Sequence, residues 1–311
     1  MNWKSYIPFF EWWPNYGQNH LKGDLTAGLT VGIMLIPQGM AYSLLAGLPP
    51  IYGLYASTVP LILYAIFGTS RQLAVGPVAM VALLIATGVG NLVETGSENY
   101  IALAILLALM VGAIQLLLGI FRLGFLVNFL SHPVISGFTS AAALIIGLSQ
   151  LKHLLGIEID RSNFIHEILI NAYQHLSEIH IVTLLIGLAG IAIIILLKKW
   201  KPSFPGPLVA VVLGILIVYG FNLAPGGVKI LQEVPEGLPA FALPNLSLTD
   251  MQALLPTALT IALVGFMESI AVAKAIQARH KNYKVRSNQE LIGLGLANLG
   301  GALFQSFPTT G

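Results

Sequence analysis

Long uninterrupted apolar stretches constrain this chain more than any other feature of its sequence. Two of them are IALAILLALMVGAIQLLLGIF at 101–121 and IVTLLIGLAGIAIIILL at 181–197. An α-helix needs about 20 mostly apolar residues to cross a bilayer, whereas a barrel strand shows about 10 residues of alternating polarity. Because the stretches do not alternate, they predict an all-α polytopic membrane protein with the lipid bilayer as its surroundings.

The composition excludes several classes of protein. Only 9% of the 311 residues are charged, and the mean hydropathy is +0.82, whereas a soluble domain is roughly 25% charged. A formal net charge of +2 is too small for a nucleic-acid partner. The absence of Cys removes disulfides, thiolate metal sites and thiol nucleophiles.

The first 24 residues hold seven aromatic side chains but lack the apolar core of a cleavable signal peptide. Aromatic rings gather where a membrane meets water. We therefore expect 1–24 to be an interfacial or cytosolic segment, with a disordered leader as the alternative.

The apolar stretches predict nine membrane segments. Their ranges are 25–46, 51–69, 76–91, 101–121, 126–150, 180–198, 205–221, 252–277 and 289–306. The connections 151–179 and 222–251 are predicted as loops, and the second is irregular because it contains four prolines.

The basic residues predict the orientation. If the N-terminus is cytoplasmic, twelve of the 15 Lys and Arg residues face the cytoplasm, and only Lys152, Arg161 and Lys229 lie on the other side. Membrane proteins keep such an excess on the cytoplasmic side. We expect a multi-pass protein of the inner or plasma membrane with a cytoplasmic N-terminus.

IPQGMAY at 36–42 interrupts the first segment. Pro37 removes a helical N–H and Gly39 loosens the backbone, and freed backbone groups at membrane depth need partners in protein or in a water-lined cavity. Gln38 adds an amide, and Tyr42 lies on the same helix face four residues later. A simple kink packed on a neighbouring helix and a ligand site both fit this pattern.

GTSRQLAVGPVAMVALL at 68–84 places Gly76 and Pro77 at the start of a short apolar run. Proline suits a helix start because its missing N–H is not needed there. If 68–75 is extended, the helix begins inside the protein, and its free N–H groups and positive dipole end form an anion site. Such interrupted segments favour a transporter site, with an ordinary short span as the alternative.

Glu268 is the only acid that we place inside an apolar span. A carboxylate facing lipid costs several kcal/mol, and intramembrane acids usually mark ion pathways. Its alternative role is a structural ion pair with Lys274.

The remaining polar residues indicate no enzyme, cofactor or metal site. The five histidines at 132, 153, 166, 175 and 180 lack metal spacing. Neither a nucleotide-binding motif nor a nucleophile–base pair is present. The glycines at 293–301 suit close helix packing in lipid.

Several motifs resemble the sulfate permeases, the bacterial relatives of the anion exchangers that include pendrin and prestin. They are PPIYGLYASTVPLILYAIFGTSR at 49–71, IPQGMAY at 36–42, QLAVGPVAM at 72–80, SHPVISGFTSAAA at 131–143, RSNQELIGLGLAN at 286–298 and QSFPTTG at 305–311. The resemblance runs from about Gly23 to the last residue.

The resemblance implies fourteen segments in two inverted seven-segment repeats, divided into core and gate domains as in uracil transporters. It implies that half-helices three and ten hold the anion between their N-termini. The site residues it implies are Gln38, Tyr42, Gly76, Pro77, Val78 and Ala79 for the substrate, and Glu268 for a coupled cation.

The same resemblance assigns 25–121 to core segments one to four, 126–221 to gate segments five to seven, and 252–311 to the start of the second repeat. PTTG at 308–311 stands where the tenth segment opens. The rest of that repeat and the cytosolic STAS domain of the family are absent, so we expect a fragment of a longer protein.

By this resemblance we expect a secondary active transporter of a small anion such as sulfate, bicarbonate or a dicarboxylate. It is coupled to H⁺ or Na⁺, works by an elevator movement of core against gate, and is a homodimer when full length. The alternatives are a passive anion channel and a nucleobase-type symporter.

Overall fold

The computed structural model describes most of the chain. The described ranges are 7–125, 150–157, 165–201, 205–231, 236–280 and 283–311, with residue 234 and single positions between 137 and 148. The predicted segment 126–150 therefore lies largely outside the described residues.

The chain divides into two compact units. The larger unit comprises Met1–Gly28, Gln38–Ser131 and Pro235–Gly311, and the smaller unit comprises Leu29–Pro37 and His132–Val234. That these units are the core and gate domains stays a prediction.

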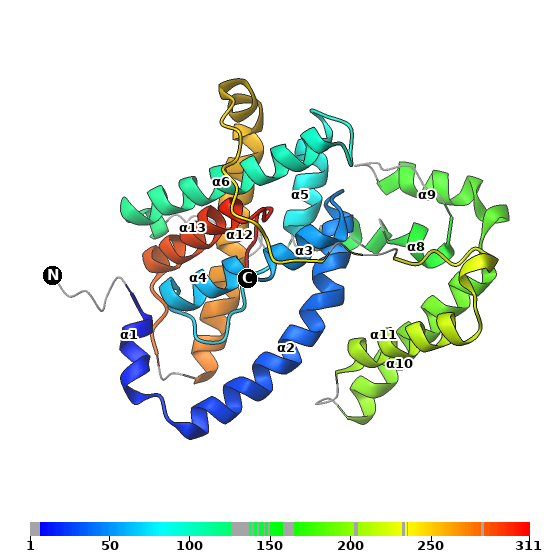
Figure 1. The fold of residues 1–311 in the computed structure, drawn as a ribbon, viewed down its shortest axis with the longest axis horizontal. Coiled ribbons are helices and arrows are strands. Elements are labelled where there is room, and N and C mark those ends of the chain that lie inside the picture. Colours follow the sequence, from blue (N-terminus) through cyan, green and yellow to red (C-terminus); the bar gives the residue numbers. More distant parts are fainter. Residues whose placement is uncertain are drawn as a thin grey trace. The chain divides into compact units, whose positions relative to one another are not determined.

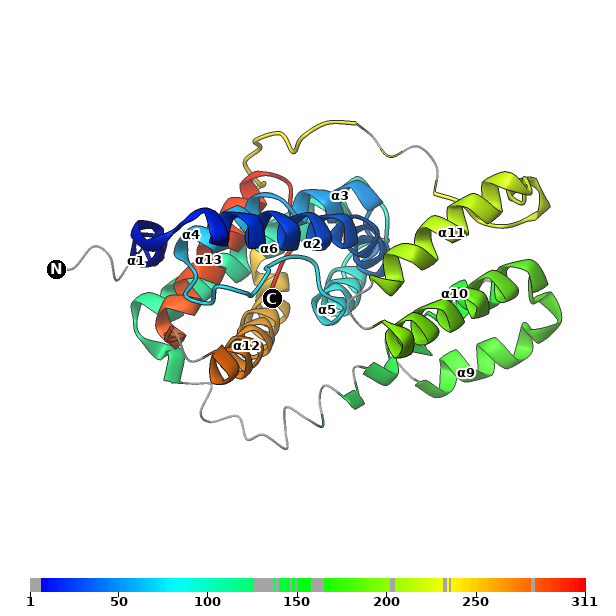
Figure 2. The same ribbon diagram turned by 90° about the horizontal axis from the view of Figure 1, so that it is seen from below.

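Helices dominate both units (Figures 1 and 2). The larger unit contains α1 (Phe9–Trp12), the 3₁₀ turn η2 (Trp13–Asn15), α3 (Pro50–Ala56), α4 (Val59–Phe67), α5 (Ala79–Gly90), α6 (Glu98–Ile120), α12 (Leu248–His280) and α13 (Ser287–Leu303), and α2 (Gln18–Leu45) has residues in both units.

Within the described residues, five stretches are long and apolar enough to cross a membrane. They are α2, the pair α3–α4, α6, α10 (Ile181–Trp200) and α12, and the shorter apolar helices are α5 and α11 (Gly206–Gly220). The bounds lie within four residues of the predicted segments, except that α2 begins at Gln18 and not at 25, inside the range predicted as an interfacial or cytosolic segment. The segment predicted at 51–69 is two helices, because the chain turns at Ser57 and Thr58 and α4 restarts with Pro60 near its N-terminus.

Helices α6 and α13 lie side by side and form the centre of the larger unit (Figure 1). Gly112 on α6 faces Gly295 on α13. A Cβ on Gly295 would lie 2.6 Å from the backbone nitrogen of Leu116, so only glycine permits this backbone contact. Close packing by the glycines at 293–301 is thereby confirmed at this crossing.

The smaller unit packs α10 against α11 (Figures 1 and 2). It also contains α8 (Leu151–Leu155), α9 (Ile165–Gln174) and the 3₁₀ turns η4 (Leu176–Glu178) and η5 (Ala224–Gly226). The prediction of 151–179 as a plain loop was therefore wrong. In α9, Ile168 and Ala172 are buried four residues apart on one face, which is the spacing of a half-buried helix.

Candidate functional site

Two extended stretches from distant parts of the sequence meet in the larger unit. The N–H of Gly76 donates to the carbonyl of Thr310 at 2.8 Å, and the N–H of Thr310 donates to the carbonyl of Gly76 at 3.1 Å. These are the two points at which the resemblance places the openings of half-helices three and ten. The structure therefore brings the two openings together as one antiparallel bridge.

Helix α5 begins directly after this bridge. Val78 is extended, with φ −131° and ψ 149°, and its side chain caps no backbone group. The first helical bond runs from the N–H of Ala82 to the carbonyl of Val78 at 3.0 Å. The N–H groups of Ala79, Met80 and Val81 thus have no carbonyl one turn earlier, and they and the helix dipole favour an anion.

Gln38 and Tyr42 lie on α2, where the Gln38 amide donates to the Tyr42 hydroxyl at 3.3 Å. Tyr42 and Val78 pack against the same apolar cluster, whereas Gln38 is solvent-accessible. The helix continues through Pro37, so this proline does not end it. Tyr42 thus shares an apolar cluster with Val78 at the start of α5. That Gln38 and Tyr42 contact an anion stays a prediction.

Gly39 has a packing role that the sequence did not reveal. It meets Gly53 of α3 so closely that a Cβ on Gly53 would lie 2.0 Å from the Gly39 carbonyl oxygen. This contact holds α2 against α3 beside the candidate site, and any side chain at Gly53 would push them apart.

Helix α12 holds the C-terminal stretch. The Thr310 hydroxyl donates to the carbonyl of Gly265 at 2.6 Å and lies 2.6 Å from the Ser269 hydroxyl. The N–H of Gly311 donates to the Ser269 hydroxyl at 3.0 Å. Ser269 directly follows Glu268, so the predicted coupling acid stands next to the residue that anchors this stretch.

Glu268 differs from every other described acid of the larger unit in one respect. Its Oε2 atom is buried and has no hydrogen-bond partner in the part of the chain that the structure describes. Lys274 makes no ion pair with it among these residues, so the alternative of a Glu268–Lys274 pair is wrong. A buried carboxylate without a partner tends to take up a proton or a cation.

A buried polar network fixes the second extended stretch to α13. Asn298 accepts from the N–H of Thr309 at 2.7 Å and donates to the Thr309 carbonyl at 3.0 Å. Its amide also donates to Gln115 of α6 at 3.0 Å, and Gln115 donates to the Ala262 carbonyl of α12 at 3.2 Å. Neither amide was singled out from the sequence, although each is a polar residue in an apolar helix, which is the signal that could have found it.

Glu290 is a second acid within the predicted spans, and it corrects the prediction that Glu268 is the only one. It is 0% exposed in the first turn of α13, inside the predicted segment 289–306. It accepts from the Tyr64 hydroxyl at 2.5 Å and from the N–H groups of Thr69 and Ser70 at 2.6 and 3.1 Å. The Thr69 hydroxyl donates to it as well, so Glu290 holds the loop that leads to Gly76.

Comparison with known proteins identifies the family. The model of the sulfate permease family matches residues 21–311. Sulfate transporter 4.1, chloroplastic, of Arabidopsis thaliana is 45% identical over 98% of this chain and 45% of its own length. A probable sulfate transporter of Mycobacterium tuberculosis is 37% identical over 95% of this chain and 52% of its own length.

A third relative, the sodium-independent sulfate anion transporter of Bos taurus, is 36% identical over 99% of this chain and 55% of its own length. The chain thus spans about half the length of the curated relatives that it matches.

Solved structures give the same result for the fold. SLC26A9 superposes with a TM-score of 0.89 at 28% identity, over 99% of this chain and 51% of that one. The transmembrane domain of the cyanobacterial bicarbonate transporter BicA superposes with a TM-score of 0.82 at 27% identity, over 95% of this chain and 76% of that one. Both share the uracil-transporter-like fold that the resemblance implied. The chain belongs to the sulfate permease family, which is a family of transporters and not of enzymes.

Proposed function

We propose that the protein carries a small anion across the membrane, and that the anion binds where the start of α5 meets the stretch 308–311. The observation that carries this proposal is the Gly76–Thr310 bridge at the unsatisfied N-terminus of α5. Free N–H groups and a helix dipole replace part of the hydration that an anion loses. Tyr42, which packs on the same cluster as Val78, and Gln38 line the site from α2.

Sulfate is the first substrate to test, because the Arabidopsis and bovine relatives are named as sulfate transporters. Bicarbonate is the second, because BicA is named as a bicarbonate transporter. A site made of backbone N–H groups recognises charge and size, so it accepts both a tetrahedral and a planar oxyanion.

Glu268 couples the transport of the anion to that of a cation in our proposal. Its support is the buried Oε2 atom, which has no partner among the described residues. Glu268 directly precedes Ser269, whose hydroxyl accepts from the N–H of Gly311. We propose H⁺ rather than Na⁺, since the bovine relative is named sodium-independent. A coupled acid also argues against the passive channel, which needs no coupling group.

The movement itself is proposed as an elevator shift of the larger unit against the smaller one. We also propose a homodimer, and a location in the cell membrane with a cytoplasmic N-terminus, which rests on the twelve-to-three division of basic residues. A single cysteine is introduced at position 2 or at position 229, which lie on opposite predicted sides. Its reaction with a membrane-impermeant thiol reagent in inside-out vesicles tests the orientation.

The decisive experiment is uptake of radiolabelled sulfate and bicarbonate into proteoliposomes that contain the protein expressed from its full gene. Saturable uptake driven by an inward H⁺ gradient is expected. Glu268→Gln should retain exchange of labelled for unlabelled anion but lose the response to the gradient.

Two results would contradict the proposal at different levels. Absent uptake of every anion would overturn the transport function. Uptake by the Glu268→Gln variant that still follows the H⁺ gradient would overturn only the coupling role of Glu268.

A further inference from the structure

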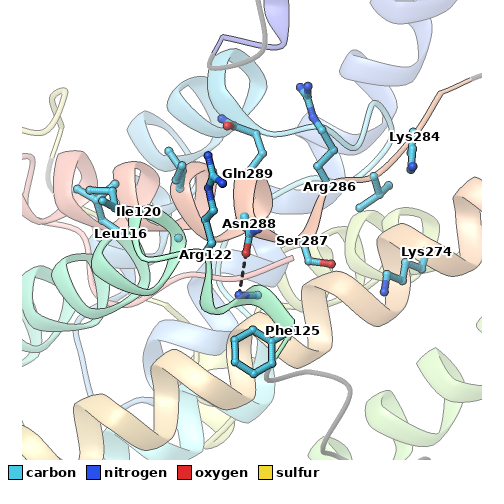
Figure 3. A pocket seen from close by; sticks show the side chains of 14 residues that line it. Leu116, Ile120, Arg122, Phe125, Lys274, Lys284, Arg286, Ser287, Asn288 and Gln289 are labelled. Carbon is cyan, nitrogen blue, oxygen red and sulfur yellow. Dashed lines mark hydrogen bonds between the residues drawn. The ribbon is translucent and has the colours of Figure 1, made fainter. Parts of the chain in front are cut away.

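Four basic side chains line one cavity in the larger unit, away from the stretches that form the proposed anion site. The cavity has a volume of about 940 Å³ and lies between the end of α6, α12 and the start of α13. Figure 3 shows the basic side chains, which are Arg122, Lys274, Lys284 and Arg286. The transport mechanism proposed above uses none of them.

Most of this positive charge has no acidic partner among the described residues. Arg286 forms an ion pair with Glu11 at 2.9 Å. In the part of the chain that the structure describes, Arg122, Lys274 and Lys284 have no acidic partner, and no acid lines the cavity. Three cations lining one hollow of this size indicate an anionic occupant.

The walls of the cavity are held in place by hydrogen bonds. The Asn288 side chain accepts from the N–H of Gly124 at 2.8 Å, which fixes the turn after α6 to the first turn of α13 (Figure 3). Within that turn, Arg122 has a left-handed backbone with φ 59°. Arg122 therefore stands on a defined turn rather than on a loose loop.

The other side of the cavity is apolar. Leu116 and Ile120 of α6, Phe125 and Ile292 complete its lining. Ile120 is 56% exposed and Phe125 49% exposed, as expected at the end of a membrane-spanning helix where hydrocarbon gives way to headgroups. A free inorganic anion covers the basic side alone, whereas a phospholipid covers both.

We propose that this cavity binds an anionic phospholipid, with its phosphate among Arg122, Lys274 and Lys284 and its acyl chains along Ile120 and Phe125. Basic pockets between membrane helices bind lipid headgroups in this way. The lipid joins α6, α12 and α13, so it stabilises the unit that carries the anion site.

The test measures thermal unfolding of the protein expressed from its full gene and stripped of lipid in detergent. Dioleoylphosphatidylglycerol replaces phosphatidylcholine stepwise, so that the total concentration of the two lipids stays constant. Inorganic phosphate is titrated in a separate experiment. The pocket variant is Lys274→Gln with Lys284→Gln. The control is Lys198→Gln with Lys199→Gln, which removes the same charge from the last turn of α10.

We expect phosphatidylglycerol to raise the unfolding midpoint of the wild type and of the control at the same concentrations. One basic residue near an anionic surface contributes about fivefold in affinity, so the pocket variant should need about 25-fold more phosphatidylglycerol. Inorganic phosphate should have no such effect.

Three results would overturn the proposal: no rise with phosphatidylglycerol, an equal loss of response in the control variant, or an equal rise with inorganic phosphate. If the double variant does not fold, Arg122→Asn replaces it, because Asn tolerates the left-handed backbone at that position. That single variant should need about fivefold more phosphatidylglycerol, and an unchanged response would overturn the proposal.

Discussion

Two acids inside the helices of the larger unit stand in opposite surroundings. Glu290, at the start of α13, accepts hydrogen bonds from Tyr64, Thr69 and Ser70. Glu268, in the middle of α12, has a buried oxygen with no partner among the described residues. The carboxyl group of Glu290 is thus part of a fixed hydrogen-bonded structure, whereas that of Glu268 has an oxygen left to bind a proton or a cation.

The difference teaches how to separate structure from function among intramembrane acids. Donors that surround Glu290 offset its desolvation, and their hydrogen bonds fix the loop at 69–70. At Glu268 the desolvation is not offset, so folding alone does not account for this acid. Substitutions around Glu290 should therefore lower the stability of the protein, whereas substitution of Glu268 should change transport and leave stability nearly unchanged.

The largest effect is expected for Glu290→Ala. It leaves the Tyr64 hydroxyl and two backbone N–H groups without an acceptor, which costs about 4 kcal/mol in the free energy of unfolding. The unfolding midpoint of the purified protein should fall by about 10 °C. Glu290→Gln keeps one acceptor and should lose less, and an unchanged midpoint for the alanine variant would contradict the structural role.

Asn298→Ala comes next. It leaves the side-chain carbonyl of Gln115 and the N–H of Thr309 without their hydrogen bonds to Asn298. We expect the free energy of unfolding to fall by about 3 kcal/mol. The measurement is the same unfolding midpoint, combined with anion uptake, which should also fall because Thr309 adjoins the bridge residue Thr310. The exposed Asn245→Ala is the matched control; a loss as large in that variant would show that the network is not the cause.

Tyr64→Phe sharpens the comparison further. It removes one of the donors to Glu290 and should cost about 1.5 kcal/mol in unfolding free energy. Tyr219, which is 88% exposed, provides the control Tyr219→Phe, whose midpoint should equal that of the wild type. In a Glu290→Ala background the Tyr64→Phe change should add little, because its partner is already gone; full additivity would speak against the bond.

The smallest effect on stability is expected for Glu268→Gln. The buried oxygen has no hydrogen bond to a described residue that the substitution would remove, and an amide is less costly to bury than a carboxylate. The unfolding free energy should stay the same or rise by about 0.5 kcal/mol. A fall comparable to that of Glu290→Ala would erase the distinction between the two regions.

Long apolar helices were predictable because their signal is local. The bounds of α6 and α11 lie within three residues of the predicted segments 101–121 and 205–221. The start of α5 after Gly76 and Pro77 was likewise visible, since proline and glycine act on the backbone at their own positions. Short amphipathic helices such as α9 were missed, because a predicted loop with mixed polarity hides their pattern.

The partners of Glu290 and Asn298 could not be predicted. Glu290 follows SNQ at a helix start, where an acid is ordinary because of the helix dipole. Its donors lie more than 200 residues earlier in the chain, 226 positions away in the case of Tyr64. No periodicity relates two such positions, so only the folded chain reveals which acid is satisfied.

The bridge between Gly76 and Thr310 also sets an order of events during synthesis. Gly76 leaves the ribosome long before Thr310, and at about 5 to 20 residues per second the interval is roughly 10 to 50 s. Over this interval α5, which is too short to cross the bilayer alone, must be kept in place without its eventual partner. We therefore expect the helix that we assign to the anion to rely on the insertion machinery until residues 308–311 have been made.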